Sequence, residues 1–147
     1  MRFAVIVSRF NEDVTGGLLE GACGYLLSKG IPLRDEDKFH APGAFEIPLL
    51  ARELARTGQY DGVIGLGCVI KGDTAHFEFI SLGATLGIQQ ASLETGVPIA
   101  FGILTTYTDE QAIARSRNDA HNKGIEAAAA CHESAQLLRR IRNLRSN

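Results

Sequence analysis

Two apolar runs, DGVIGLGCVI at 61–70 and PIAFGILTT at 98–106, constrain the fold more than any other feature of the chain. Both lack the polar alternation of a half-exposed strand, so we expect strands with helices covering each face. Shorter runs at 3–7 and 37–41 also have strand character, and helical stretches separate all of them. This βαβα alternation predicts an α/β fold, a three-layer α/β/α sandwich with a central parallel four-stranded sheet.

The helices between these strands are bounded by glycine and proline signals. The one expected at 77–96 is apolar almost all round, so a single subunit could not cover it, and small residues Gly83, Ala84 and Gly87 would let another helix approach. We therefore expect it inside a large core or at a subunit contact. The other helices are expected at 14–28, from Pro42-Gly43 to Thr57-Gly58, and after Thr108 with a break near Asn118-Asp119.

The composition indicates a single globular domain, residues 1–147, that binds small molecules. The chain is 45% apolar and 22% charged with a formal net charge of −2, which gives no general attraction to nucleic acid or to an anionic membrane. The basic stretch RRIRNLRSN near the C-terminus is interpreted as a solvated helix end, because the helix macrodipole favours cations there.

Neither a metal site nor a membrane anchor is expected. Cys23, Cys68 and Cys131 are odd in number and lack the spacing of a metal site, so we expect reduced core thiols. The N-terminal apolar run stops at Ser8, short of a signal sequence, and no run reaches the roughly 18 apolar residues of a membrane span. These features predict a cytoplasmic location.

Ligands of such a sheet bind at the carboxyl ends of its parallel strands, because the loops leaving those ends share one edge. The candidate loops are 8–12, 40–46, 69–76 and 105–110. In the third, GDTAH combines a flexible Gly72, a Thr74 hydroxyl and the N–H groups of a helix start, which suits an anion such as phosphate. A nucleotide P-loop is disfavoured because Asp73 stands where its lysine belongs.

Each of these residues also has a purely structural interpretation. Asp73 and Thr74 would serve as caps of the following helix, and His76 is either a proton-transfer group near neutral pH or an ordinary surface histidine. Glu46 either complements a helix dipole or accepts hydrogen bonds from a polyol, and Phe10 either packs or stacks on a flat heterocycle. Spacing alone does not choose between them.

Five segments in order, SRFN, PGAFEIP, GCVIKGDTAHF, SLETGVPIAFGILTT and HNKGIEAA, resemble the lumazine synthase family from about Phe3 to about Leu138. The resemblance implies a flavodoxin-like fold and the condensation of 5-amino-6-ribitylamino-2,4-pyrimidinedione with 3,4-dihydroxy-2-butanone 4-phosphate, without metal or organic cofactor. It also implies roles for the loop residues: stacking by Phe10, ribityl binding by Gly43, Ala44, Phe45 and Glu46, main-chain contacts to the pyrimidine from Val69 and Ile70, phosphate binding by Gly72, Asp73 and Thr74, and proton shuttling by His76.

The family's site is shared between neighbouring subunits of a homopentamer, and the resemblance assigns Phe101, Arg115 and Lys123 to the neighbour's share. A fixed guanidinium such as that of Arg115 would stabilise phosphate as it leaves. The segment departs from the family pattern at Ala114, Arg117 and His121, and Ala75 replaces a bulkier residue. The short stretch before the first strand favours a free pentamer or a pentamer pair over an icosahedral shell.

Two other functions compete with the synthase. One is a catalytically idle relative that binds flavin or lumazine or acts as an assembly protein, which the presence of His76, Arg115 and Lys123 disfavours. The other is a nucleotide-binding flavodoxin-like module, which the missing P-loop lysine disfavours.

Overall fold

The sheet of the computed structural model, which describes residues 1–146, is entirely parallel. Its strands lie in the order β2-β1-β3-β4, so β2 and β4 are the edges. Every strand begins and ends within one residue of its predicted position, because the apolar runs are the segments that both layers of helices bury. The strands are β1 (Phe3–Ser8), β2 (Lys38–Ala41), β3 (Gly62–Ile70) and β4 (Ile99–Thr106).

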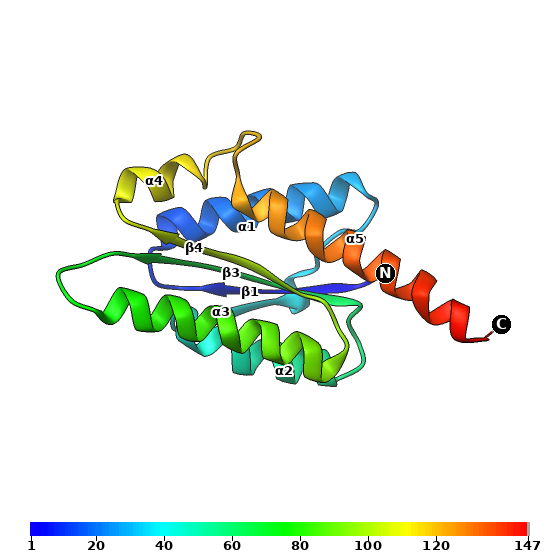
Figure 1. Ribbon diagram of the computed structural model, residues 1–147. Coiled ribbons are helices and arrows are strands. Elements are labelled where there is room, and N and C mark those ends of the chain that lie inside the picture. The colour runs from blue at the N-terminus through cyan, green and yellow to red at the C-terminus, as the bar shows by residue number, and fades with distance from the viewer. Residues whose placement is uncertain (147) are drawn as a thin grey trace.

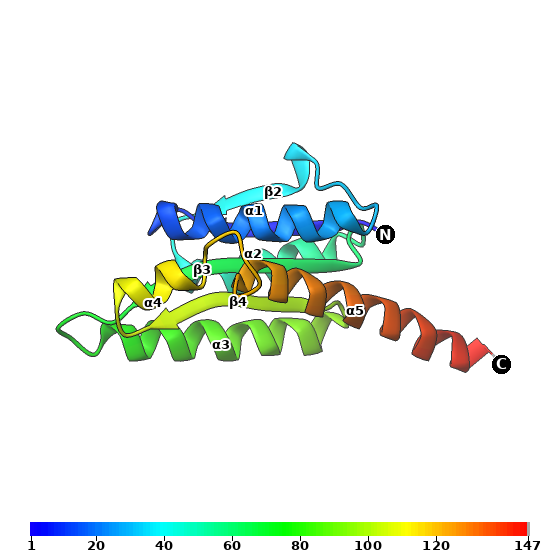
Figure 2. The ribbon, with the colours of Figure 1, turned by 90° about the horizontal axis from the view of Figure 1, so that it is seen from above.

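Helices cover both faces of the sheet, which confirms the three-layer α/β/α sandwich of flavodoxin-like type. In Figure 1, α1, α4 and α5 lie on one face, and α2 and α3 lie on the other. Figure 2 shows β2 and β4 at opposite edges and the end of α5 extending past the sheet. The helices are α1 (Glu12–Ser28), α2 (Ile47–Arg56), α3 (His76–Thr95), α4 (Asp109–Ala114) and α5 (Lys123–Asn143), with 3-10 turns at Asp35–Asp37, Ala44–Glu46 and Leu144–Ser146.

The core divides at the sheet because successive side chains of a strand point to opposite faces. Phe3, Val5 and Val7 of β1 pack with α1 and α5, whereas Ala4 and Ile6 pack with α2 and α3. All six residues of β1 are buried. The absence of polar alternation in the strand sequences is therefore explained by two apolar layers.

The glycines of α3 allow close packing of neighbouring elements. A Cβ on Gly83 would lie 2.9 Å from the Phe45 ring, and one on Gly87 would lie 2.8 Å from Pro48 Cβ. These glycines, and the fully buried Ala84, accommodate neighbouring elements of the same chain. The expected close approach of another helix is confirmed at Gly87, because Pro48 belongs to α2. Other apolar side chains of α3 are exposed: Phe79, Leu82, Leu86 and Leu93.

A buried charge fastens the chain at the edge of the sheet where the strands begin. The Asp37 carboxylate, 1% exposed, accepts hydrogen bonds from Arg2 Nη2 at 2.7 Å and from Tyr60 Oη at 2.9 Å. Burial by itself raises the pKa of Asp37, but the bonds from Arg2 and Tyr60 outweigh it and hold that pKa below its usual value.

The end of the C-terminal helix is exposed from Arg139 to Ser146, which confirms the predicted solvated end, although two of its arginines bond to other parts of the chain. Arg139 Nη2 donates to Asp61 Oδ1 at 3.1 Å, and Arg142 donates to the Gly96 carbonyl.

The cysteines are free; Cys68 and Cys131 are buried as expected, whereas Cys23 is only partly buried. Within residues 1–146, no helix has the length and apolar content that crossing a membrane requires.

Candidate functional site

The loop after β1 presents Phe10 at the carboxyl end of the sheet. Arg9 N–H donates to the Ala41 carbonyl at 2.8 Å, and Asn11 takes a left-handed conformation (φ 61°, ψ 52°) that Asn tolerates better than most residues. Asn11 Nδ2 donates to the Cys68 carbonyl at 3.2 Å. These bonds fix both neighbours of Phe10, whose ring is 67% exposed.

The loop after β2 turns directly into a 3-10 turn, Ala44–Glu46, that leads into α2. A Cβ on Gly43 would lie 3.1 Å from Glu46 Oε2. Any larger residue at position 43 would therefore press on the Glu46 carboxylate. Phe45 is 58% exposed and Glu46 is also exposed, so both side chains are available to a ligand.

The loop after β3, residues 71–75, is exposed throughout and ends where α3 begins at His76. The N-cap residue of α3 is Ala75, which makes no side-chain cap bond, and Thr74 Oγ accepts only a long bond of 3.4 Å from His76 N–H. The alternative in which Asp73 and Thr74 cap this helix was therefore wrong. The N–H groups at a helix start can bind an anion. At the start of α3, Glu78 N–H donates to the Ala75 carbonyl at 3.0 Å, and His76 N–H makes only the long bond to Thr74.

These three loops line one cavity of about 470 Å³, which we call the α3 pocket. Ten residues that the sequence assigned to substrate lie around it: Phe10, Gly43, Ala44, Phe45, Glu46, Val69, Ile70, Gly72, Thr74 and His76. The predicted Asp73 is not part of the lining. Pro42, Cys68, Phe77 and Ile80 complete it.

The residues that sequence reasoning missed have structural explanations. Ile80 lies four residues after His76 on α3, so helical spacing from His76 could have indicated Ile80 but not Phe77. Cys68 lies near the end of β3, and burial raises the pKa of its thiol to about 11. The Cys68 thiol therefore stays neutral near pH 7 and acts as a wall of the pocket.

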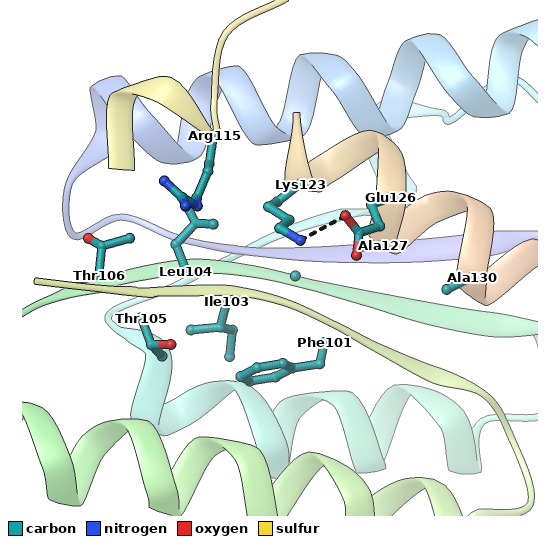
Figure 3. A pocket seen from close by; sticks show the side chains of 11 residues that line it. Phe101, Ile103, Leu104, Thr105, Thr106, Arg115, Lys123, Glu126, Ala127 and Ala130 are labelled. Atoms are coloured by element: carbon teal, nitrogen blue, oxygen red, sulfur yellow. Dashed lines mark hydrogen bonds and ion pairs between the residues drawn. The ribbon is translucent and has the colours of Figure 1, made fainter. Parts of the chain in front are cut away.

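A second cavity of about 330 Å³, the β4 pocket, is lined by the remaining predicted residues, Phe101, Arg115 and Lys123, together with Glu126. Figure 3 shows Arg115 and Lys123 on one side of β4 and Phe101 on the other. Lys123 Nζ donates to Glu126 Oε2 at 2.8 Å, and Arg115 Nη1 donates to the Gln111 carbonyl at 3.0 Å.

The segment between α4 and α5 distinguishes Arg115 from its neighbour Arg117. Arg115 lines the β4 pocket and Arg117 does not. His121 is exposed and lies outside both pockets, and its N–H donates to Asp119 Oδ1 at 2.8 Å. The departures from the family pattern at Arg117 and His121 thus add no side chain to either cavity.

The two pockets have no lining residue in common. Within one chain, Phe101, Arg115 and Lys123 are therefore not brought into the pocket that contains His76. The groups of the β4 pocket border an edge strand, which has no strand partner on its outer side within residues 1–146.

The fold and its pocket at the carboxyl ends of parallel strands define a flavodoxin-like α/β protein with a small-molecule site. Residues 1–139 match the sequence model of the 6,7-dimethyl-8-ribityllumazine synthase family, and the chain belongs to that family. A 6,7-dimethyl-8-ribityllumazine synthase 1 from Caulobacter vibrioides is 62% identical over 141 residues, 96% of this chain and 92% of the relative.

Two further relatives carry the name 6,7-dimethyl-8-ribityllumazine synthase. The one from Salinibacter ruber is 51% identical over 95% of this chain and 90% of its own length. The one from Nitratidesulfovibrio vulgaris is 47% identical over 96% of this chain and 90% of its own length. The resemblance that the sequence motifs carried is thereby confirmed.

Proposed function

We propose that this chain forms 6,7-dimethyl-8-ribityllumazine at a site that two copies of the chain build together. As a member of the family, it is a transferase of riboflavin biosynthesis that condenses 5-amino-6-ribitylamino-2,4-pyrimidinedione with 3,4-dihydroxy-2-butanone 4-phosphate and releases phosphate and water. The observation that carries the shared site is the division of the expected residues between two separate pockets.

The α3 pocket holds the pyrimidine substrate in this proposal. Phe10 stacks on the ring, since an exposed aromatic face attracts a flat heterocycle. Main-chain groups of Val69 and Ile70 meet the edge of the pyrimidine. The ribityl chain, a polyol, lies along residues 43–46, where the Glu46 carboxylate accepts hydrogen bonds from its hydroxyls.

The start of α3 binds the phosphorylated substrate. Gly72, Asp73 and Thr74 cradle the phosphate, and the free N–H groups of the first helical turn point toward a bound anion. His76 lies two residues after the cradle and shuttles protons during Schiff-base formation, phosphate elimination and ring closure. Much of the acceleration comes from holding two reactive molecules together, so His76 assists a reaction that proximity favours.

The neighbouring copy contributes Phe101, Arg115 and Lys123. Arg115 contacts the phosphate and stabilises charge as it leaves, because a guanidinium forms strong charge-assisted hydrogen bonds with phosphate oxygens. The edge position of β4 and the exposed apolar side chains of α3 support a contact between copies at the β4 edge of the sheet. A homopentamer is the assembly we propose, and it makes association a condition of activity.

The scheme needs neither a metal nor an organic cofactor. Its setting is the cytoplasm, which the free thiols of Cys23, Cys68 and Cys131 support, since a reducing compartment maintains thiols.

The activity is tested by mixing the purified chain with both substrates and following the lumazine chromophore and released phosphate. We expect equal amounts of the two products, and formation of neither would contradict the function. Sedimentation velocity tests the assembly: we expect five times the chain mass of 15.8 kDa, and an active monomer or dimer would contradict the pentameric site.

A further inference from the structure

One buried amide fastens the segment that carries both cations of the β4 pocket. Asn122 is 2% exposed. Its Nδ2 donates to the carbonyls of Gly17 at 3.0 Å, Ser116 at 3.2 Å and Arg117 at 2.8 Å. Its Oδ1 accepts from Gly124 N–H at 2.8 Å and Ile125 N–H at 3.2 Å, which caps α5.

Glycines on α1 let Asn122 and the segment 115–124 approach that helix closely. A Cβ on Gly17 would lie 2.2 Å from the Ser116 carbonyl oxygen, and one on Gly21 would lie 2.3 Å from Asn122 Oδ1. On the other side, a Cβ on Gly124 would lie 1.9 Å from the Leu18 carbonyl oxygen. Since α1 is a long helix packed on the sheet, the segment 115–124 is fixed to a rigid element.

The hydrogen bonds of Asn122 hold both ends of the segment 115–124. Ser116, whose carbonyl Asn122 holds, follows Arg115 directly, and Lys123 follows Asn122 itself. Lys123 N–H also donates to the Arg115 carbonyl at 2.9 Å, which brings the two backbones together. The positions of the guanidinium and the ammonium group relative to each other therefore depend on one side chain that touches neither pocket.

We propose that Asn122 is a positioning residue that presets Arg115 and Lys123 for the phosphate of the substrate. This inference rests on the roles proposed above for those two cations. Cations fixed before the substrate arrives stabilise an anion without paying for reorganisation. Capping α5 needs only the oxygen of residue 122, whereas closing the loop onto α1 needs the amide N–H groups as well.

Asn122→Ser and Asn122→Asp separate the capping of α5 from the closing of the loop onto α1. Both variants keep an oxygen that caps α5. The Asp carboxylate has no donor, and the single, shorter hydroxyl of Ser does not replace the amide bonds to the three carbonyls. We expect the KM for the phosphorylated substrate to rise about tenfold, the lower range for losing a group that orients a ligand-binding residue. The KM for the pyrimidine should change less than about twofold, whereas kcat should fall to the extent that Arg115 stabilises the leaving phosphate.

Tyr60→Phe is the matched control, because it also removes one buried hydrogen bond but lies at the amino-terminal edge of the sheet. It should leave the KM for both substrates unchanged. If the Asn122 variants raise the KM for both substrates equally, or change neither, Asn122 serves only the stability of the fold and the proposal is overturned.

A double-variant cycle with Arg115→Ala identifies the route of the effect. We expect Asn122→Ser to raise the KM for the phosphorylated substrate less in the Arg115→Ala background than in the original chain, since residues that act through one contact are not additive. The remaining effect is the part that acts through Lys123. Full additivity would overturn the positioning role. If Arg115→Ala alone leaves this KM unchanged, the proposed role of Arg115 fails, and the inference about Asn122 fails with it.

Discussion

The two segments that carry the proposed phosphate-binding groups are built in opposite ways. Residues 71–75 are exposed throughout, and their helix begins without a side-chain cap bond. Residues 115–123 are fastened by the buried Asn122 and by a bond from Lys123 N–H to the Arg115 carbonyl. The first segment leaves backbone N–H groups open, whereas the second fixes two cations.

This difference follows from what each group needs in order to bind an anion. N–H groups at a helix start are aimed by the helix itself, so the loop before them needs no further support. Long cationic side chains have many rotamers, and a fixed backbone removes part of the entropy cost of aligning them. One anion site can therefore combine two kinds of segment. We call residues 71–75 with the start of α3 the open half, and residues 115–123 the preset half.

The largest expected effect comes from the open half. Replacing His76 by Ala or Asn should lower kcat by about 10²- to 10⁴-fold, the usual contribution of a positioned acid or base, while the KM for both substrates stays nearly constant. Steady-state kinetics measures both constants. His121→Ala is the matched control because His121 is exposed and lies outside both pockets. An unchanged kcat for the His76 variants would remove this residue from the mechanism.

The preset half should show its effect in phosphate recognition. Arg115→Ala should lower kcat/KM for the phosphorylated substrate by about 10²-fold, because charge-assisted hydrogen bonds to phosphate are lost. Arg117→Ala should have far less effect, since Arg117 does not line the β4 pocket. Titration with inorganic phosphate gives a second measure. If Arg117 proves to be the sensitive position, the assignment of this segment is wrong.

A buried charge remote from both halves separates stability from ligand binding. Asp37→Asn should lower the free energy of unfolding by about 2 kcal/mol, the scale of hydrogen bonds to a charged group, and leave the kinetic constants unchanged. Because the pKa of Asp37 is lowered by folding, its contribution is present above the pKa of the unfolded chain and is lost as pH falls through the folded pKa.

Denaturant unfolding between pH 7 and the acid range measures this contribution. The original chain should lose stability toward low pH more steeply than Asp37→Asn, and the two curves should converge in acid. Parallel curves would contradict the assignment of the acid loss to Asp37.

The smallest expected effect concerns the helix that leads to Arg115. Thr108 Oγ accepts from Gln111 N–H at 3.2 Å and caps α4. Thr108→Ala should reduce stability by about 1 kcal/mol and raise the KM for the phosphorylated substrate only slightly, because Asn122 still holds the backbone after Arg115. A rise as large as that of Arg115→Ala would mean that α4, and not Asn122, presets the guanidinium.

The strands could be predicted because burial on both faces leaves a direct sequence pattern, and all of them were located within one residue. The start of α1 was less certain from pattern alone: it begins at Glu12 and not at residue 14, because acidic residues are favourable in a first turn and Asn11 takes the left-handed N-cap position. The loops at the carboxyl ends followed from the fold class.

Tertiary contacts decided what the sequence could not. Gly83 and Gly87 fit the pattern of a helix contact, but only the structure shows that Phe45 and Pro48 of the same chain fill that space. Asn122 could be recognised as a cap residue from its type, yet its bonds to Gly17, Ser116 and Arg117 join segments that sequence spacing does not relate. The separation into two pockets is likewise a property of the folded chain.

Subunit mixing tests the shared site most directly. Chains with His76→Ala and chains with Arg115→Ala, each inactive or nearly so, are co-expressed with different tags and purified as mixed assemblies. If each site takes His76 from one copy and Arg115 from the next, about a quarter of the sites are intact at equal, random mixing. The account predicts recovery of activity on that scale, and activity no higher than the sum of the separate variants would contradict it.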